Sequence, residues 1–238
     1  MNKLNGKIAL ITGASGGIGA AIAKRFSELG LKLVLCGRSE EKLRQLAAAC
    51  STETMIYTGD ITADNFPHSC LQAVTERFGG LDILVNNAGM ALSCPLEQTE
   101  PEQFDAIMAL NVRAPYFLCR QALPLLRQSE QATILNIASV VAHKGYPLQS
   151  AYAASKHALA GFTKSLANEV WQDGIRVHLI SPGAVFTDMV RISRPDLSSD
   201  GMILAEDIAE IAAFFLQHRT NAVIDEIEVH RAGKAPFA

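Results

Sequence analysis

The chain has 238 residues, of which 49% are hydrophobic and 19% are charged, and its formal net charge is −3. This length is typical of one domain with a full core, and the composition argues against a disordered chain. The slight negative charge offers no general attraction to nucleic acid or to an anionic membrane. No apolar run reaches the ~20 residues needed to cross a bilayer, so no membrane partner is expected.

The N-terminal residues and the cysteines predict a cytoplasmic protein. The opening "MNKLNGKIALITG" enters a strand at once and lacks an apolar signal segment with a small-residue cleavage site. The five cysteines are an odd number without a CxxC pair, and the histidines show no ligand spacing. We therefore expect neither a disulfide framework nor a metal site.

Short β-branched or apolar runs alternate with longer helical patterns. We predict strands over 7–12, 32–36, 54–58, 82–86, 133–139, 176–181 and 226–229. Helices are predicted near 17–30, 40–50, 65–79, 101–127, 150–172 and 205–217. This alternation predicts an α/β fold: a doubly wound parallel sheet of about seven strands with helices on both faces. Since no linker or repeat divides the chain, residues 1–238 are expected to form a single domain, with ligands at the carboxyl ends of the strands.

A glycine-rich turn, "TGASGGIG" at residues 12–19, joins the first strand to the first helix. Glycines at 13, 17 and 19 lack a Cβ, so the backbone can approach a pyrophosphate at the helix N-terminus. The spacing is TGxxxGxG rather than GxGxxG, and a plain connection is the alternative. The position directly after the first strand favours nucleotide binding.

The stretch "SAYAASKHALAGF" at 150–162 places Tyr152 and Lys156 on one face of a helix among small side chains. Reduction of a ketone builds negative charge on its oxygen, so a nearby acid must supply a proton. A cation one turn away favours the phenolate, and we expect Lys156 to lower the pKa of Tyr152. An ordinary exposed helix pair is the alternative, because YxxxK is common by chance.

Two further polar residues belong to the same prediction. Ser139 closes the strand 133–139, where its hydroxyl can reach the same carbonyl oxygen. Asn111 stands four residues before Pro115, whose missing amide hydrogen frees the Asn111 carbonyl to accept another hydrogen bond. The proline also fits a tolerated kink.

Six motifs in order resemble the short-chain dehydrogenase/reductase family, in its compact single-domain branch. They are "TGASGGIG", "NNAG" at 86–89, Asn111, Ser139, "YAASK" at 152–156 and "SPGAVFT" at 181–187. The resemblance covers nearly the whole chain and implies a Rossmann fold. It implies that Ser139 orients the substrate and stabilises the oxyanion, with Tyr152 as the acid. It also implies that Lys156 binds the nicotinamide ribose and that Asn111 holds a water in a proton relay.

The resemblance also implies a set of cofactor-binding residues. They are Gly13, Ser15, Gly17, Ile18, Gly19, Arg38, Asp60, Ile61, Asn87, Ala88, Gly89, Tyr152, Lys156, Pro182, Gly183, Val185 and Thr187. For two of them a local structural role is the alternative. Asp60 fits an N-cap or turn aspartate, and Thr187 fits the N-cap of "DMVRIS".

The end of the second strand, "VLCGRSEEKL", indicates which dinucleotide is bound. Gly37 stands where an NAD-binding sheet places an acid, and Arg38 follows it. A guanidinium can hold a 2′-phosphate through two charge-assisted hydrogen bonds, whereas an acid would repel it. NADP(H) is therefore preferred, although Glu40 and Glu41 begin the next helix and Gly16 replaces a second basic residue. NAD(H) stays possible, and a solvated surface arginine is the alternative.

The substrate is expected to be a small-molecule carbonyl or alcohol. A flap over 188–204 is expected to cover an open pocket, whose plausible lining residues are Leu92, Val141, His143, Tyr146 and Met189. His143 fits either a substrate contact or a solvated loop histidine. Arg113, Arg120 and Arg127 form a basic stripe conceivable for an acidic carrier protein, but Asp173 in "WQDGI" departs from carrier-protein reductases, which tend to be basic there.

The sequence therefore predicts an NADPH-dependent carbonyl reductase, or reversibly an alcohol dehydrogenase, acting on a small or medium ketone. The alternatives are NAD-linked alcohol oxidation and a non-catalytic nucleotide-sensing or scaffold protein on the same fold. By the resemblance, helices 101–127 and 150–172 predict a homo-oligomer, a tetramer or a dimer. The tail "VHRAGKAPFA" fits either a contact with a neighbouring subunit or a disordered end.

Overall fold

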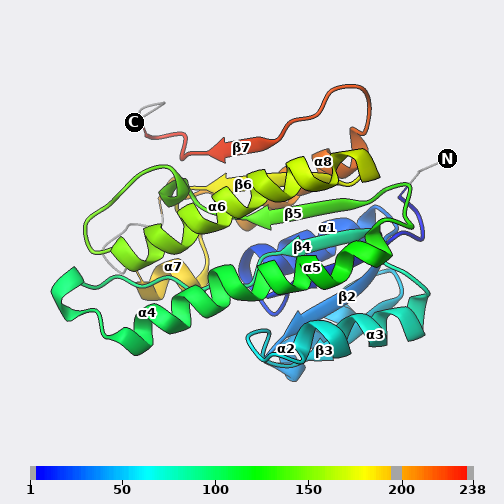
Figure 1. The fold of residues 1–238 in the computed structure, drawn as a ribbon, viewed down its shortest axis with the longest axis horizontal. Helices are drawn as coiled ribbons and strands as arrows, with labels where there is room; N and C mark the ends of the chain where they lie inside the picture. Colours follow the sequence, from blue (N-terminus) through cyan, green and yellow to red (C-terminus); the bar gives the residue numbers. More distant parts are fainter. Residues whose placement is uncertain (1–3, 194–199, 235–238) are drawn as a thin grey trace.

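The centre of the protein is a parallel sheet of seven strands. The computed structural model describes residues 4–193 and 200–234, and its strands follow the order β3-β2-β1-β4-β5-β6-β7. Every pairing between neighbours is parallel. Figure 1 shows α5 and α6 crossing the near side of the sheet, with α1 behind it. The predicted doubly wound parallel fold is confirmed.

The elements of the described chain alternate as the sequence predicts. The strands are β1 (Ile8–Thr12), β2 (Lys32–Gly37), β3 (Thr54–Thr58), β4 (Ile83–Asn86), β5 (Thr133–Ile137), β6 (Arg176–Pro182) and β7 (Glu226–Val229). The α-helices are α1 (Gly17–Glu28), α2 (Glu40–Ala48), α3 (Phe66–Phe78), α4 (Pro101–Met108), α5 (Ala114–Leu126), α6 (Ser150–Val170), α7 (Asp188–Ser193) and α8 (Ala205–Gln217). Short helical turns are η1 (Leu96–Gln98), η2 (Ala109–Arg113), η3 (Val140–Ala142) and η4 (Trp171–Asp173).

Each face of the sheet has its own core, because successive strand residues point to opposite sides. Ile11 and Leu35 belong to a cluster with residues of α1, α2 and α8. Leu10 and Val34, one position away, pack with residues of α3, α5 and α6. Since both faces are covered, these strands are apolar throughout rather than alternating.

The helix predicted as one piece over 101–127 is divided by a π-helical turn, η2. The amide of Ala114 donates to the carbonyl of Ala109, five residues back, in place of the usual four. Pro115 follows at the start of α5, where the absence of an amide hydrogen costs little. Such turns are rare and occur frequently at functional sites, and Asn111 lies in this one with 1% of its surface exposed.

Two boundaries differ from the prediction for local reasons. Strand β5 ends at Ile137 rather than at 139, because the Ser139 side chain accepts a hydrogen bond from the amide of Val141 and starts η3. Helix α7 was not predicted as an element. Thr187 Oγ1 accepts a hydrogen bond from the amide of Val190, as the N-cap alternative for that threonine expects.

Parts of two predictions fall outside the described residues: 194–199 of the expected flap and 235–238 of the tail. Among the helices that the structure describes, none combines the length and the apolar character that a membrane crossing requires.

Candidate active site

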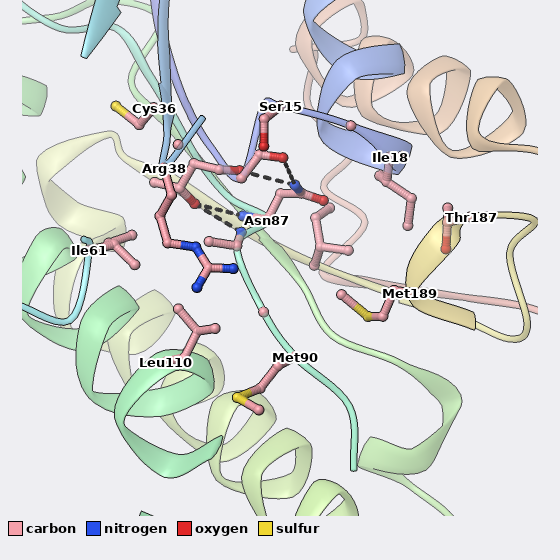
Figure 2. Close-up of a pocket in the computed structure, with 18 of the residues that line it drawn as sticks. Ser15, Ile18, Cys36, Arg38, Ile61, Asn87, Met90, Leu110, Thr187 and Met189 are labelled. Carbon is pink, nitrogen blue, oxygen red and sulfur yellow. Dashed lines mark hydrogen bonds between the residues drawn. The ribbon is translucent and has the colours of Figure 1, made fainter. Parts of the chain in front are cut away.

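One cavity of about 620 Å³ lies at the carboxyl ends of the central strands (Figure 2). It brings together residues from seven segments between Gly13 and Thr187 that the sequence assigned to a site. Those on its wall are Gly13, Ser15, Gly17, Ile18, Arg38, Asp60, Ile61, Asn87, Ala88, Gly89, Ser139, Tyr152, Lys156, Pro182, Gly183, Val185 and Thr187. Gly19 and Asn111 do not line it.

The glycine turn needs glycine at specific positions. Gly13 and Gly17 have φ angles of 65° and 53°, which L side chains rarely adopt. A Cβ at Gly19 would lie 2.4 Å from the carbonyl oxygen of Gly13, so Gly19 packs behind the turn instead of facing the cavity. The turn therefore brings bare backbone to the start of α1.

The loop after β4 holds this turn in place. Asn87 Nδ2 donates to the carbonyl oxygens of Thr12 at 3.0 Å and Gly13 at 3.1 Å. Thr12 Oγ1 in turn accepts from the amides of Asn87 and Ala88. The Asn87 side chain, predicted as a cofactor contact, is thus occupied by the protein itself, while the residue still borders the cavity.

These residues fit a bound dinucleotide. No side chain caps the N-terminus of α1, so its first amides are available to a phosphate. A Cβ at Gly89 would lie 3.1 Å from Asn111 Oδ1 and 3.6 Å from Lys156 Nζ, so only glycine leaves that wall bare. The cavity runs from this turn to Lys156 without interruption.

Two basic side chains border the cavity at the end of β2. Figure 2 shows the Arg38 guanidinium extending into the space among Ile61, Asn87 and Leu110. Lys42, one turn into α2, lines the same region, and neither residue forms an ion pair within the described residues. Lys42 was not predicted as a site residue, because its place on the cavity wall depends on how α2 packs beside the end of β2.

Position 37 has little room for a side chain. A Cβ there would lie 3.3 Å from Ser15 Oγ and 3.5 Å from a methyl carbon of Leu43. A carboxylate at this position would require its neighbours to move. The glycine therefore keeps a negative charge away from the space that Arg38 enters.

Asp60 has the local structural role that the sequence left open. Its Oδ1 accepts hydrogen bonds from the amide of Thr62 at 2.9 Å and from the Thr62 hydroxyl at 2.8 Å. These bonds, and to a smaller extent the charge of Arg38, hold the pKa of Asp60 below its ordinary value. Asp60 is a turn aspartate that also borders the cavity.

Lys156 carries its amine in a buried position, with 5% of the residue exposed. Its Nζ donates a hydrogen bond of 2.9 Å to the carbonyl oxygen of Ile137. Burial lowers the pKa of this amine to about 8, because a charge is poorly solvated there. Nζ lies 5.9 Å from the centre of the Tyr152 ring.

The expected lowering of the Tyr152 pKa is wrong for this structure. Burial raises the pKa of the phenol, and a hydrogen bond with Ser139 offsets only part of that rise. The ammonium of Lys156 makes no direct contact with the hydroxyl and is directed to Ile137. Tyr152 is therefore a protonated phenol at neutral pH, held next to the hydroxyl of Ser139.

Asn111 connects the loop after β4 with α6. Its Oδ1 accepts from the amide of Met90, and its Nδ2 donates to the carbonyl of Met90 and to Ser155 Oγ, all at 2.9–3.0 Å. Ser155 Oγ donates to the carbonyl of Tyr152 at 2.8 Å. The side chain thus fixes the wall beside Tyr152, and a water on the Asn111 carbonyl stays a prediction.

The substrate end differs from the expected lining. Met189 borders the cavity, and Figure 2 shows it with Met90 on the side away from Cys36. Leu92, Val141, His143 and Tyr146 do not line it. Val141 is buried in packing, and His143 is held by Glu226 instead of facing a substrate.

One further part of the wall was not predicted and is formed by Ala106, Ala109 and Leu110. Their spacing of three and four residues places them on one side of the helical segment. Small residues at that spacing are a signal, but it is shared with ordinary helix packing.

Comparison with known proteins identifies the family to which this cavity belongs. The model of the short chain dehydrogenase family matches residues 7–198. A levodione reductase structure is 30% identical, with a TM-score of 0.88, covering 95% of this chain and 96% of that one. A 3-ketoacyl-(acyl-carrier-protein) reductase from Brucella melitensis, complexed with NADH, is 32% identical with a TM-score of 0.86, covering 95% and 97%. A metagenomic short-chain oxidoreductase in complex with NADP is 33% identical with a TM-score of 0.83 and the same coverage.

Proposed function

The chain belongs to the short chain dehydrogenase family, and we propose that this NAD(P)-dependent oxidoreductase reduces a small or medium ketone with NADPH. One observation carries the proposal. Ser139, Tyr152 and Lys156 border the same cavity as the glycine turn and Arg38. A proton donor and a dinucleotide cradle thus share one space.

When bound, the nicotinamide supplies the hydride. Ser139 and Tyr152, which share a hydrogen bond, both present their hydroxyls to the ketone oxygen. Ser139 orients that oxygen and stabilises its developing charge, and Tyr152 transfers its phenolic proton to it. Lys156, whose Nζ lies 5.9 Å from the ring centre, would hold the nicotinamide ribose next to this pair.

The proposed reduction uses Tyr152 in its protonated form. A ketone reductase needs a phenol that holds its proton until the alkoxide forms, and the raised pKa of Tyr152 supplies this. Alcohol oxidation would require a phenolate at the start of the reaction.

The preference for NADPH is supported by the charges at the end of β2. Arg38 and Lys42 border the cavity and form no ion pair among the described residues, and Gly37 stands where an acid would bind a ribose hydroxyl. A guanidinium and an ammonium together match a 2′-phosphate.

The arginine stripe supports a free ketone rather than a substrate tethered to a carrier protein. Arg127 Nε forms an ion pair of 2.7 Å with Asp173, and Arg113 forms one of 2.7 Å with Asp64. Two of the three arginines of the stripe therefore form ion pairs within the chain. Less positive charge is left to attract an acidic partner.

A homo-oligomer is the assembly that the exposed aromatics support. Tyr116 on α5 packs against Phe162 on α6 yet stays half exposed, and Phe104 on α4 is exposed as well. Sedimentation velocity of the purified protein tests this, because a monomer at micromolar concentration would contradict it.

The main test is a panel of ketones, with oxidation of NADPH and of NADH followed by absorbance. We expect turnover with NADPH on some small or medium ketones, and a higher kcat/KM than with NADH. Tyr152→Phe removes the proton donor and should lower kcat by about 10³-fold or more while NADPH still binds. Tight NADPH binding without any ketone reduction would contradict the proposal, and faster turnover with NADH would reassign the cofactor.

A further inference from the structure

Outside the cavity, two polar side chains donate to one carboxylate oxygen. Glu226 Oε1, on β7, accepts hydrogen bonds from His143 Nε2 at 2.5 Å and from Ser181 Oγ at 3.1 Å. Its other oxygen lies 3.8 Å from Lys164 Nζ on α6. Glu226 and His143 are partly buried and Ser181 is fully buried, so this cluster is shielded from bulk water.

The cluster adjoins the residue proposed to hold the ketone oxygen. Ser139 caps η3, a single turn of three residues, and His143 follows directly after it. The amide of Ala142 donates to the carbonyl of Ser139, and the amide of His143 donates to that of Val140. Ser139 and His143 are thus the two ends of one short turn.

The two partners of Glu226 differ in how firmly the backbone holds them. Ser181 lies in β6, which pairs with β5 on one side and β7 on the other. His143 lies in a loop, and a 3₁₀ turn of three residues has little stability of its own. Loss of the Glu226 carboxylate should therefore release the η3 turn and leave β6 in place.

We propose that Glu226 is a positioning residue that fixes Ser139 through His143. The outermost strand of the sheet thereby sets the place of a hydroxyl in the active site, over a separation of 83 residues between the hydrogen-bonded pair. The inference rests on the proposed function only in requiring that Ser139 take part in ketone reduction.

The decisive experiment is a double-variant cycle between Glu226 and Ser139, measured as kcat and KM for a ketone that the panel identifies. Ser139→Ala should lower kcat by about 10²-fold. Glu226→Ala should lower kcat by about tenfold with the KM for NADPH unchanged, because a misplaced hydroxyl weakens the transition state. In the S139A background, E226A should have less than about a twofold further effect.

Matched variants separate positioning from general loss of structure. Glu228→Ala removes the same side chain two residues along β7, where it is exposed and has no hydrogen bond or ion pair within the described residues, and should leave kcat unchanged. Lys164→Ala should do the same, because that lysine is largely exposed. Glu226→Gln keeps an acceptor oxygen and should restore kcat to within about threefold of the natural protein.

The outcomes distinguish this inference from the proposed function. If S139A retains full activity, the role of Ser139 is wrong and the positioning role of Glu226 fails with it, while the ketone reduction found in the panel stands. If no ketone in the panel is reduced, the proposed function itself fails. If S139A is impaired and E226A lowers kcat by the same factor in both backgrounds, only the positioning role is overturned. His143→Ala in place of E226A gives a second measurement, and its effect should not add to that of E226A.

Discussion

Lys156 Nζ donates a 2.9 Å hydrogen bond to the carbonyl oxygen of Ile137, which joins a buried amine of α6 to the last residue of β5. Within the described residues this carbonyl is the one protein acceptor of the amine, whose pKa burial lowers to about 8. Keeping it charged at neutral pH therefore costs folding free energy. The site is less stable than an apolar one would be.

Lys156→Met should make this cost measurable. The variant removes the buried charge at similar volume, so we expect it to be about 1–2 kcal/mol more stable than the natural protein at pH 7, while ketone reduction is lost. Urea denaturation followed by circular dichroism measures the difference. A variant less stable than the natural protein would mean that the hydrogen bond to Ile137 outweighs the cost of burial.

The difference in unfolding free energy between the natural protein and K156M should also depend on pH, with a definite sign. Below about pH 8 Lys156 is charged in both the folded and the unfolded chain, and the full cost is present. Between about pH 8 and the ordinary lysine value of 10.5, the unfolded chain binds more protons, so the free energy of unfolding rises with pH. The stability gap between the two proteins should therefore narrow from pH 7 to pH 9.5.

Arg38→Ala should change cofactor use selectively. Loss of a charge-assisted hydrogen bond to a 2′-phosphate predicts a rise of about 10–100-fold in the KM for NADPH, with the KM for NADH unchanged. Lys42→Ala should raise the KM for NADPH by a smaller factor. Arg44→Ala is the control on α2, since that side chain pairs with Glu40 and does not line the cavity. Equal losses with both cofactors would place Arg38 outside the phosphate site.

Asn111→Asp should be more harmful than Asn111→Ala despite its closer shape. Aspartate would set an oxygen against the carbonyl of Met90, where Nδ2 now donates at 2.9 Å. Two buried acceptors that repel each other should lower the free energy of unfolding by about 2–4 kcal/mol, measured by thermal or urea denaturation. Asn168→Asp is the control, because its Nδ2 also donates to a backbone carbonyl but is exposed. Similar losses at both positions would show that the burial of Asn111 does not matter.

Gly19→Ala should weaken both the fold and dinucleotide binding. The Cβ of the new alanine would overlap the carbonyl of Gly13. We therefore expect the free energy of unfolding to fall by about 1–3 kcal/mol and the KM for NADPH to rise. Gly161→Ala, in an open stretch of α6 with nothing within 4 Å of the new carbon, should instead stabilise the protein by about 0.5–1 kcal/mol. Unchanged NADPH binding in G19A would show that the turn tolerates this displacement.

The parts of this protein that depend on local pattern could be predicted from the sequence. Apolar runs and helical spacing are sufficient to place all seven strands of the described sheet, and the position of Lys156 four residues after Tyr152 is enough to put both on one side of a helix. The end of β5 was misplaced by two residues. In the sequence, a serine that caps the following turn has the same apolar neighbours as a serine that ends a strand, so the two cases look alike.

The errors concern properties that distant segments create. The role of His143 depends on Glu226, 83 residues later, and nothing near His143 in the chain indicates that partner. The direction of the Tyr152 pKa depends on how completely the surrounding elements enclose the phenol, which side-chain spacing does not report. The contribution of Lys42 required knowing where α2 begins relative to the cavity.

The π-helical turn at Ala109–Arg113 lets the consecutive helices α4 and α5 contact two different parts of the protein. Ala106, before the turn, and Ala109, its first residue, form part of the cavity wall. After the turn, Leu118 and Cys119 are buried in the core between α5 and the sheet. The widened coil offsets these two stretches by one residue's rotation, about 100°. The first stretch can therefore face the cavity while the second faces the core. In a regular helix of this sequence, one of the two stretches would be rotated away from its contacts.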